Sequence, residues 1–190
     1  MLLTVRVGVP SRKMKDLRIE EIETKDAGLL SEVAIKAYSD HYLNLWHDSG
    51  KWYIEKYFSV VKLTEEIKDP NTRFFIAFFK DSPAGFLKIN INAPLAGFEE
   101  KNALEIERIY LNNSVAGQGI GRALVELTLK IAEEQNKDII WLKAMDTSAG
   151  PLAFYRKMGF EITGTHTLKH GLMKEALRGM VIMVKNITGK

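Results

Sequence analysis

Three glycines fall within five positions of a turn that the sequence places between a strand and a helix. The segment 116–122 reads AGQGIGR, and apolar residues at helical spacing follow it. Glycines let a backbone fold closely around a ligand. The first turn of the following helix offers unpaired N–H groups and the positive end of the helix dipole, and Arg122 adds a full positive charge. The pattern predicts a site for a phosphate or a pyrophosphate.

Three classes of phosphate ligand compete for this turn, besides a tight turn that binds nothing. A Walker A loop is excluded because no Gly-Lys-Ser/Thr ends the motif. A Rossmann dinucleotide loop needs G-x-G-x-x-G directly after a strand. Here the spacing is G-x-G-x-G, and about five residues separate it from Leu111, although Asp146 could act as the ribose-binding acid. The third class is coenzyme A.

Two acids, Glu105 and Glu107, precede the turn on a strand expected over residues 104–111. Alternation predicts that both share one side of this strand with Ile109 and Leu111. A carboxylate placed near a substrate amine can accept its proton. The alternative is that the acids only pair with Lys or Arg on a solvated face.

A second motif, SAGPLAFYRKMGF at 148–160, lies about 35 residues beyond the glycine turn. It resembles the helix of the GNAT acetyltransferase superfamily in which a small apolar run leads to Tyr and then to Gly-Phe. The strand LEIERIYL at 104–111, together with the turn at 116–122, is similar to the acetyl-CoA motif of the same superfamily. The resemblance spans about residues 17–187.

The resemblance implies an α/β (α+β) fold, with a mixed central sheet of about seven strands flanked by helices. It implies acetyl-CoA as co-substrate and no metal. The implied contacts to acetyl-CoA are Ile109, Tyr110, Leu111, Gly117, Gln118, Gly119, Ile120, Gly121, Arg122, Ser148 and Tyr155. Two positions depart from the family pattern, because Ala116 replaces the usual Arg or Gln and Ser148 replaces the frequent Asn.

The implied reaction passes an acetyl group directly from coenzyme A to an amine. Neutralising a primary alkylammonium at pH 7 costs about 4.6 kcal/mol, so a proton acceptor is needed. Glu107 matches the base position of spermidine/spermine acetyltransferase-like members and is preferred, while Glu105 matches that of histone-acetylating members. Tyr155 matches the general acid that protonates the leaving thiolate. Backbone N–H groups of the segment 109–111, where the strand parts from its neighbour, match the oxyanion donors.

Several further segments resemble the bacterial and archaeal spermidine/spermine acetyltransferase-like (PaiA-like) branch. They are Asp69–Ala77, Ala84–Asn90, Ala103–Tyr110, Gly159-Phe160 and Gly164–His166. The resemblance favours a small polyamine as substrate, and Tyr38, Asp40 and Tyr42 could supply aromatic faces and a carboxylate for it. Two alternatives stay open: acetylation of a protein N-terminus or lysine, and a non-catalytic regulator that binds coenzyme A.

Composition narrows the class of protein. The chain has 190 residues, 46% hydrophobic and 27% charged, with a net charge of +3 and no cysteine. Disulfides, thiolate nucleophiles and zinc fingers are thereby excluded. The tail cluster of Arg12, Lys13 and Lys15 is too short to predict nucleic-acid binding. No stretch approaches the roughly 20 apolar residues of a membrane helix, and no secretory signal is recognised, so a cytoplasmic enzyme is expected.

The elements that position these residues follow from periodicity. Strands are predicted near 17–22, 73–79, 84–91, 104–111, 138–142, 161–165 and 180–184, and helices near 24–37, 52–58, 64–67, 123–132 and 152–158. We expect an N-terminal arm at 1–16 and one domain at 17–188. The histidine pairs His41/His47 and His166/His170 lack a convincing third metal ligand. Edge strands near the C-terminus could form a homodimer.

Overall fold

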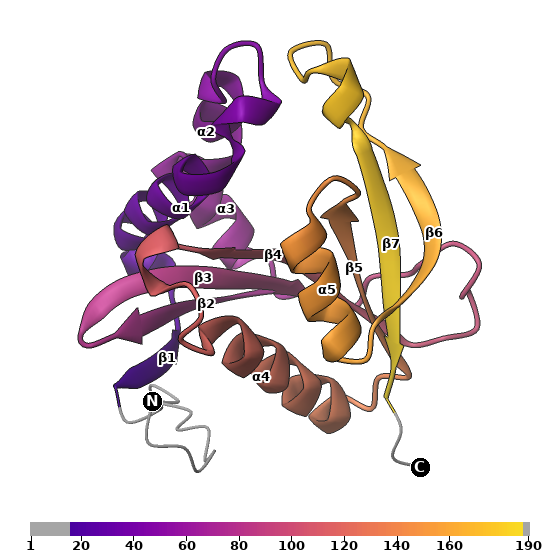
Figure 1. Cartoon of the computed structure of the whole chain (residues 1–190). Coiled ribbons are helices and arrows are strands. Elements are labelled where there is room, and N and C mark those ends of the chain that lie inside the picture. The colour runs from indigo at the N-terminus through magenta and orange to yellow at the C-terminus, as the bar shows by residue number, and fades with distance from the viewer. Residues whose placement is uncertain (1–15, 188–190) are drawn as a thin grey trace.

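Seven strands form one mixed sheet in the order β1-β2-β3-β4-β5-β7-β6, with helices packed on both faces (Figure 1). This computed structural model describes residues 16–187. The strands are β1 (Leu17–Glu21), β2 (Thr72–Phe79), β3 (Ser82–Asn90), β4 (Ala103–Leu111), β5 (Ile139–Met145), β6 (Glu161–Thr167) and β7 (Gly179–Asn186). The predicted fold class is confirmed. The predicted arm at 1–16 lies, apart from Asp16, outside the described residues.

The helices agree with the predicted periodicity to within a few residues. The α-helices are α1 (Ala27–Tyr42), α2 (Lys51–Phe58), α3 (Val60–Lys68), α4 (Ile120–Glu134) and α5 (Ala149–Lys157). Short 3₁₀ turns are η2 (Thr24–Asp26), η3 (Leu43–Leu45), η4 (Asn113–Val115) and η5 (Glu175–Leu177). Among residues 16–187, no helix combines the length and the apolar character needed to cross a membrane.

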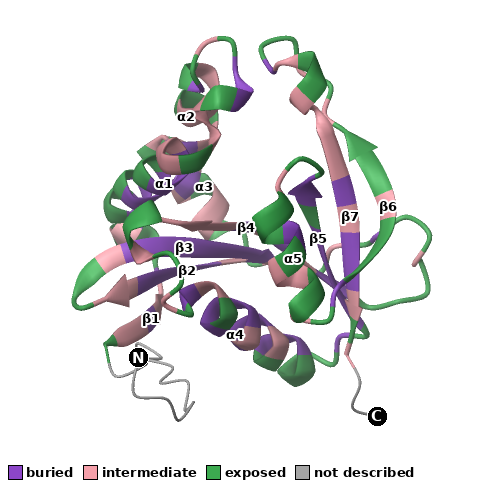
Figure 2. Ribbon diagram, in the orientation of Figure 1, coloured by how far each residue is buried: buried purple, intermediate pink, exposed green. Residues whose placement is uncertain are grey.

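Alternate residues of the central strands face two separate cores. On β3, Leu87 and Ile89 pack against α4, while Phe86 packs against α1 and α3. Figure 2 shows β3 buried along most of its length, as expected for a strand covered on both faces. The sheet is therefore most tightly enclosed at its centre, where β3 pairs with β4.

One extra residue interrupts the pairing of β3 with β4. Lys88 lies opposite Arg108, but the next residue of β3, Ile89, lies opposite Ile106, so Glu107 has no partner in the register. Such a β-bulge reverses the alternation beyond it. Ile109 and Leu111 consequently pack with the α4 core, on the opposite face from Glu105. The prediction that these four β4 residues share one side was wrong for this reason.

The strands β4 and β5 pair over only part of their length. Parallel pairing runs from Ala103–Ile139 to Ile106–Leu142, and no further pair joins the two strands within the described residues. Beyond that point β5 continues beside β7 alone. The two strands part, as the sequence motif implied, and the later half of β4 has a free edge on this side.

The free edge exposes alternate peptide groups of β4. The N–H of Asn112 donates to the carbonyl of Ala84 at 2.8 Å, toward β3. The backbone N–H and C=O groups of successive residues point to opposite sides of an antiparallel strand. Those of Tyr110 therefore also point toward β3, whereas the N–H and C=O groups of Ile109 and Leu111 point to the side from which β5 has moved away. Of the three predicted backbone contacts to acetyl-CoA, Tyr110 is thus excluded as an N–H donor.

The strand β6 is one edge of the sheet, and most of its residues are exposed (Figure 2). An uncovered edge strand offers unpaired backbone groups to another chain. A homodimer through this region stays a prediction.

Gly85 on β3 allows a close approach to β4, which predicts a sharp effect of a single methyl group. A Cβ at this position would lie 2.3 Å from the Tyr110 carbonyl oxygen, whereas a Cβ at Gly28, inside α1, would meet nothing within 4 Å. We expect Gly85→Ala to lower the free energy of unfolding by about 1–3 kcal/mol. The control Gly28→Ala should raise it by up to about 1 kcal/mol. Urea unfolding followed by circular dichroism measures both, and a Gly85→Ala protein as stable as the parent would contradict this packing.

Candidate active site

The glycine turn ends in a helix N-terminus with unused donors. Gly119 is the N-cap of α4 with φ +83°, in the left-handed region that favours glycine, and it brings no side chain to cap the helix. The Ala123 N–H is the donor that reaches back to the Gly119 carbonyl, at 3.1 Å. The N–H groups of Ile120, Gly121 and Arg122 therefore have no partner inside the helix. This geometry fits a pyrophosphate.

Three elements converge beside this helix start. A Cβ on Gly121 would lie 3.6 Å from Leu111 of β4 and 3.6 Å from Phe154 of α5. The donors of α4 thus lie next to the end of β4, on the side where it has left β5. A long ligand held by its phosphates at α4 can reach the free edge at Ile109.

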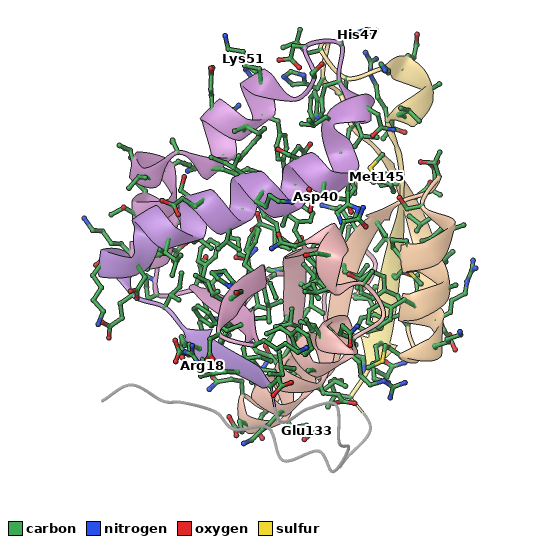
Figure 3. The ribbon with its side chains drawn as sticks, turned by 60° about the vertical axis from the view of Figure 1, so that its left-hand side comes forward. Arg18, Asp40, His47, Lys51, Glu133 and Met145 are labelled. Carbon is green, nitrogen blue, oxygen red and sulfur yellow. The ribbon has the colours of Figure 1, made fainter. Side chains whose placement is uncertain are left out.

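Two residues at the end of α1 fasten this region. Asp40 accepts a hydrogen bond from the Asn113 N–H at 2.9 Å, and a ring nitrogen of His41 bonds the Leu111 carbonyl at 2.9 Å. Figure 3 shows Asp40 at this end of α1. Lys36 pairs with Asp40, and both that bond and the Asn113 N–H lower the pKa of its carboxyl. Where the sequence predicted a substrate contact, Asp40 braces the segment after β4.

Tyr155 lies on α5 beside Phe154 and Phe160, with ring centroids 5.1 and 5.8 Å away. Burial, and to a lesser extent Tyr42, raises its pKa above the ordinary tyrosine value. No hydrogen bond to its hydroxyl is found among residues 16–187. A protonated, uncommitted hydroxyl can donate to a substrate. Ser148, the N-cap of α5, also leaves its hydroxyl unused for capping.

The predicted substrate tyrosines lie in an aromatic cluster between α1, α2 and β4. Tyr38 is 3% exposed, its hydroxyl accepts a hydrogen bond from Trp46, and its ring stacks on Tyr53 at 4.6 Å. It packs inside the protein, where the sequence predicted a substrate contact. Tyr42 is only partly buried, and its ring lies 5.2 Å from that of Tyr110.

The acids of β4 have unequal surroundings. Glu107 pairs with Lys88 at 2.6 Å and with Arg108 at 2.9 Å, and Glu66 of α3 pairs with the same two cations at 2.9 and 3.1 Å. We call these four residues the ion cluster. Glu105 has no ion pair among the described residues, and Asn90 donates to it at 2.8 Å.

The pKa values of the two acids move apart. Burial raises the pKa of Glu105, and the Asn90 hydrogen bond only partly opposes it. Burial also acts to raise the pKa of Glu107, but Arg108 and Lys88 outweigh it and lower that pKa. Glu105 is thus the stronger base of the pair.

Sequence reasoning missed Glu66, Lys88, Asn90 and Arg108. One signal was available: Lys88 sits in the apolar run AGFLKINI, and a lysine buried there needs a carboxylate partner. Its 5% exposure bears this out.

Two loops meet across the end of the molecule where β5 stops. The His47 N–H donates to the Leu172 carbonyl at 2.9 Å, and the Lys174 N–H donates to the Leu45 carbonyl at 2.9 Å. We call the residues 45–47 and 172–174 the clasp. Trp46 and Met173 pair at its centre and pack with Met145 from the end of β5. Figures 1 and 3 show the two loops side by side, with His47 at the junction.

No group of three histidine, aspartate or glutamate side chains is placed to hold a metal ion within residues 16–187. His170 instead packs beside the clasp, where the centroid of its ring lies 3.8 Å from that of the Trp52 ring. His41 is occupied as well, through its bond to the Leu111 carbonyl.

Comparison with known proteins bears on this arrangement. The profile of the Acetyltransferase (GNAT) family matches residues 32–160. An uncharacterized N-acetyltransferase from the pepI 3' region of Lactobacillus delbrueckii subsp. lactis is 27% identical over 86% of this chain and 99% of its own length. The streptothricin acetyltransferase of Streptomyces lavendulae is 31% identical over 52% of this chain and 50% of its own.

A solved structure shares the fold. The crystal structure of the PaiA N-acetyltransferase from Thermoplasma acidophilum in complex with coenzyme A superposes with a TM-score of 0.71 at 23% identity, over 90% of this chain and 98% of that one. Given the family match over most of the sequence, the fold and the open helix start beside a parted strand, the chain belongs to the GNAT family of acetyl-CoA-dependent N-acetyltransferases.

Proposed function

We propose that this protein acetylates a primary amine of a small molecule by direct attack in a ternary complex, with the polyamines spermidine and spermine as first candidates. The observation that carries the proposal is the junction of α4, β4 and α5, where free N–H groups of Ile120–Arg122 adjoin the free edge of β4. Acetyl-CoA supplies the activated acetyl thioester when it binds there.

Three parts of the site contribute to binding and to the reaction in different ways. The turn Gly117–Arg122 holds the pyrophosphate mainly through the free N–H groups of Ile120, Gly121 and Arg122, since Ala116 contributes no charged side chain and the Gln118 N–H already donates to the Val115 carbonyl. The peptide groups of Ile109 and Leu111 face the parted side and can donate to negative charge that develops on the acyl oxygen. Tyr155 supplies the proton for the departing sulfur.

The amine must lose a proton before it attacks. Glu105 suits this step better than Glu107, because Glu107 is committed to two cations and its pKa is lowered. A carboxylate with a raised pKa is nearer in basicity to the amine and takes its proton more readily. We therefore assign the acceptor role to Glu105, which reverses the preference for Glu107 drawn from the resemblance.

The clasp favours a small amine over a protein. Two backbone hydrogen bonds join the loops across this end of the molecule, so an extended peptide could not lie across them without breaking the junction. A slender amine needs no such opening. The PaiA-like pattern of the sequence points to the polyamines within this class.

An acceptor screen tests the function. Purified protein with acetyl-CoA should release coenzyme A with spermidine or spermine, and little with lysine-containing or N-terminal peptides. Streptothricin, the substrate in the name of the Streptomyces relative, belongs in the panel. Thiol release, read with a chromogenic disulfide reagent, measures turnover. Binding of acetyl-CoA without turnover of any amine would instead favour a regulator that only binds coenzyme A.

Tyr155→Phe isolates the proton donor. The ring and its packing stay, so coenzyme A should bind as in the parent, whereas kcat should fall about 100-fold. The raised pKa keeps the hydroxyl protonated, so the parent should lose no activity through Tyr155 up to about pH 10. Isothermal titration and steady-state kinetics give the two readouts. An unchanged kcat would remove Tyr155 from the chemistry.

A disulfide tests whether the clasp stays shut. The chain has no cysteine. His47 and Leu172 are exposed, and a hydrogen bond between their backbone groups holds them next to each other. The oxidised double variant His47→Cys/Leu172→Cys should acetylate the small amine at nearly the rate of its reduced form. Each single variant, treated with the same oxidant, is the control. Loss of turnover on oxidation, restored by dithiothreitol, would show that the clasp opens in every cycle.

A further inference from the structure

Asn90 joins the two acids of β4 through one amide group. Its Nδ2 donates to Glu105 at 2.8 Å and to Glu107 at 2.8 Å, and its Oδ1 accepts from the Thr72 hydroxyl at 3.1 Å. The Thr72 hydroxyl and the two carboxylates together fix which end of the amide faces the acids. Both N–H donors of Asn90 are thereby used on the acid pair.

The ion cluster closes on itself. Lys88 and Arg108 each contact Glu66 and Glu107, so two positive charges meet two negative ones. The side chains of Lys88 and Arg108 are only 7% and 5% exposed, which leaves little water to compete. Glu107 is thereby held as a carboxylate, and Glu105 remains outside the cluster.

We propose that Asn90 is a positioning residue: it aligns Glu105 against the ionised Glu107, so that Glu105 alone of the two accepts the proton of the substrate amine. In that step the ammonium N–H bond breaks, its electron pair stays on nitrogen, and the proton bonds to a carboxylate oxygen of Glu105. The inference rests on the proposed function for its proton transfer, but the placement of the charges is independent of it.

Charged groups from several elements surround Glu105. Burial raises its pKa most, the charge of Glu107 raises it further, and Lys143 of β5 and Lys88 of β3 lower it by less. Arg108 and Glu66 balance each other's charge within the ion cluster. The Asn90 hydrogen bond favours the charged form and so lowers the pKa of Glu105. Removing that bond must therefore raise this pKa further.

Asn90→Ala is the test, with Asn92→Ala as matched control because Asn92 bonds Lys137 near the same end of β3 and touches neither acid. Carboxyl ¹³C NMR gives the pKa values of Glu105 and Glu107, and kcat/KM gives the acid limb of the pH profile. In Asn90→Ala both the pKa of Glu105 and the acid limb should move to higher pH. For every pH unit by which the limb moves, kcat/KM on the acid side should fall about tenfold. Asn92→Ala should leave both unchanged.

Two further variants keep the result decisive. Thr72→Val frees the amide from its orienting bond and should move the limb in the same direction, by less, if Asn90→Ala does not fold. Glu105→Gln should abolish the limb. An acid limb whose midpoint matches the pKa of Glu107, or one that does not move in Asn90→Ala, overturns the inference. If no amine is turned over, the proposed function fails, while the carboxyl titrations still decide whether Asn90 sets the pKa of Glu105.

Discussion

One residue of β4, Glu107, has no residue opposite it on β3, and this extra residue determines how the rest of the site is arranged. Without it, strict alternation would place Ile109 and Leu111 on the face of Glu105. The bulge instead turns Arg108 and Tyr110 toward α1–α3 and leaves the peptide groups of Ile109 and Leu111 facing the side that β5 has left. The same shift brings Arg108 next to Lys88, so this local irregularity creates the ion cluster, whereas the free edge arises where β5 leaves β4 after the pair Ile106–Leu142.

The ion cluster is better understood as placement of charge than as a source of stability. Desolvation offsets much of the attraction between buried ions, so such groups add little net stability. Removing one partner is nevertheless destabilising, because it leaves the other as an uncompensated buried charge. Here the four charges sum to zero and are fixed from α3, β3 and β4. Their effect falls on Glu107, which stays ionised, and through Asn90 on Glu105.

The sequence predicted what depends on local pattern. Helices, strands and the glycine turn follow from periodicity and from residues with special backbone freedom, and they lie close to where they were expected. The bulge escaped prediction because LEIERIYL alternates without a break, and an extra residue leaves no mark in such a pattern. The clasp and the bonds of Asp40 and His41 escaped because they join residues about 70 or more positions apart. Contacts between such distant residues become visible only in the folded structure.

Under the proposed function, the shape of the site contributes more than its charge to the selection of the amine. The sequence suggested a groove with several carboxylates, yet Asp40 is paired with Lys36, and Glu107 is paired within the ion cluster. Of the acids predicted for the site, Glu105 alone keeps a carboxylate without a cation. Attraction of a polycation by many acids is thus ruled out as the main source of selectivity at these positions. Under the proposed function, selection then rests on the clasp, which would limit the width of the substrate, and on Glu105, which would accept the proton of the one nitrogen that reacts.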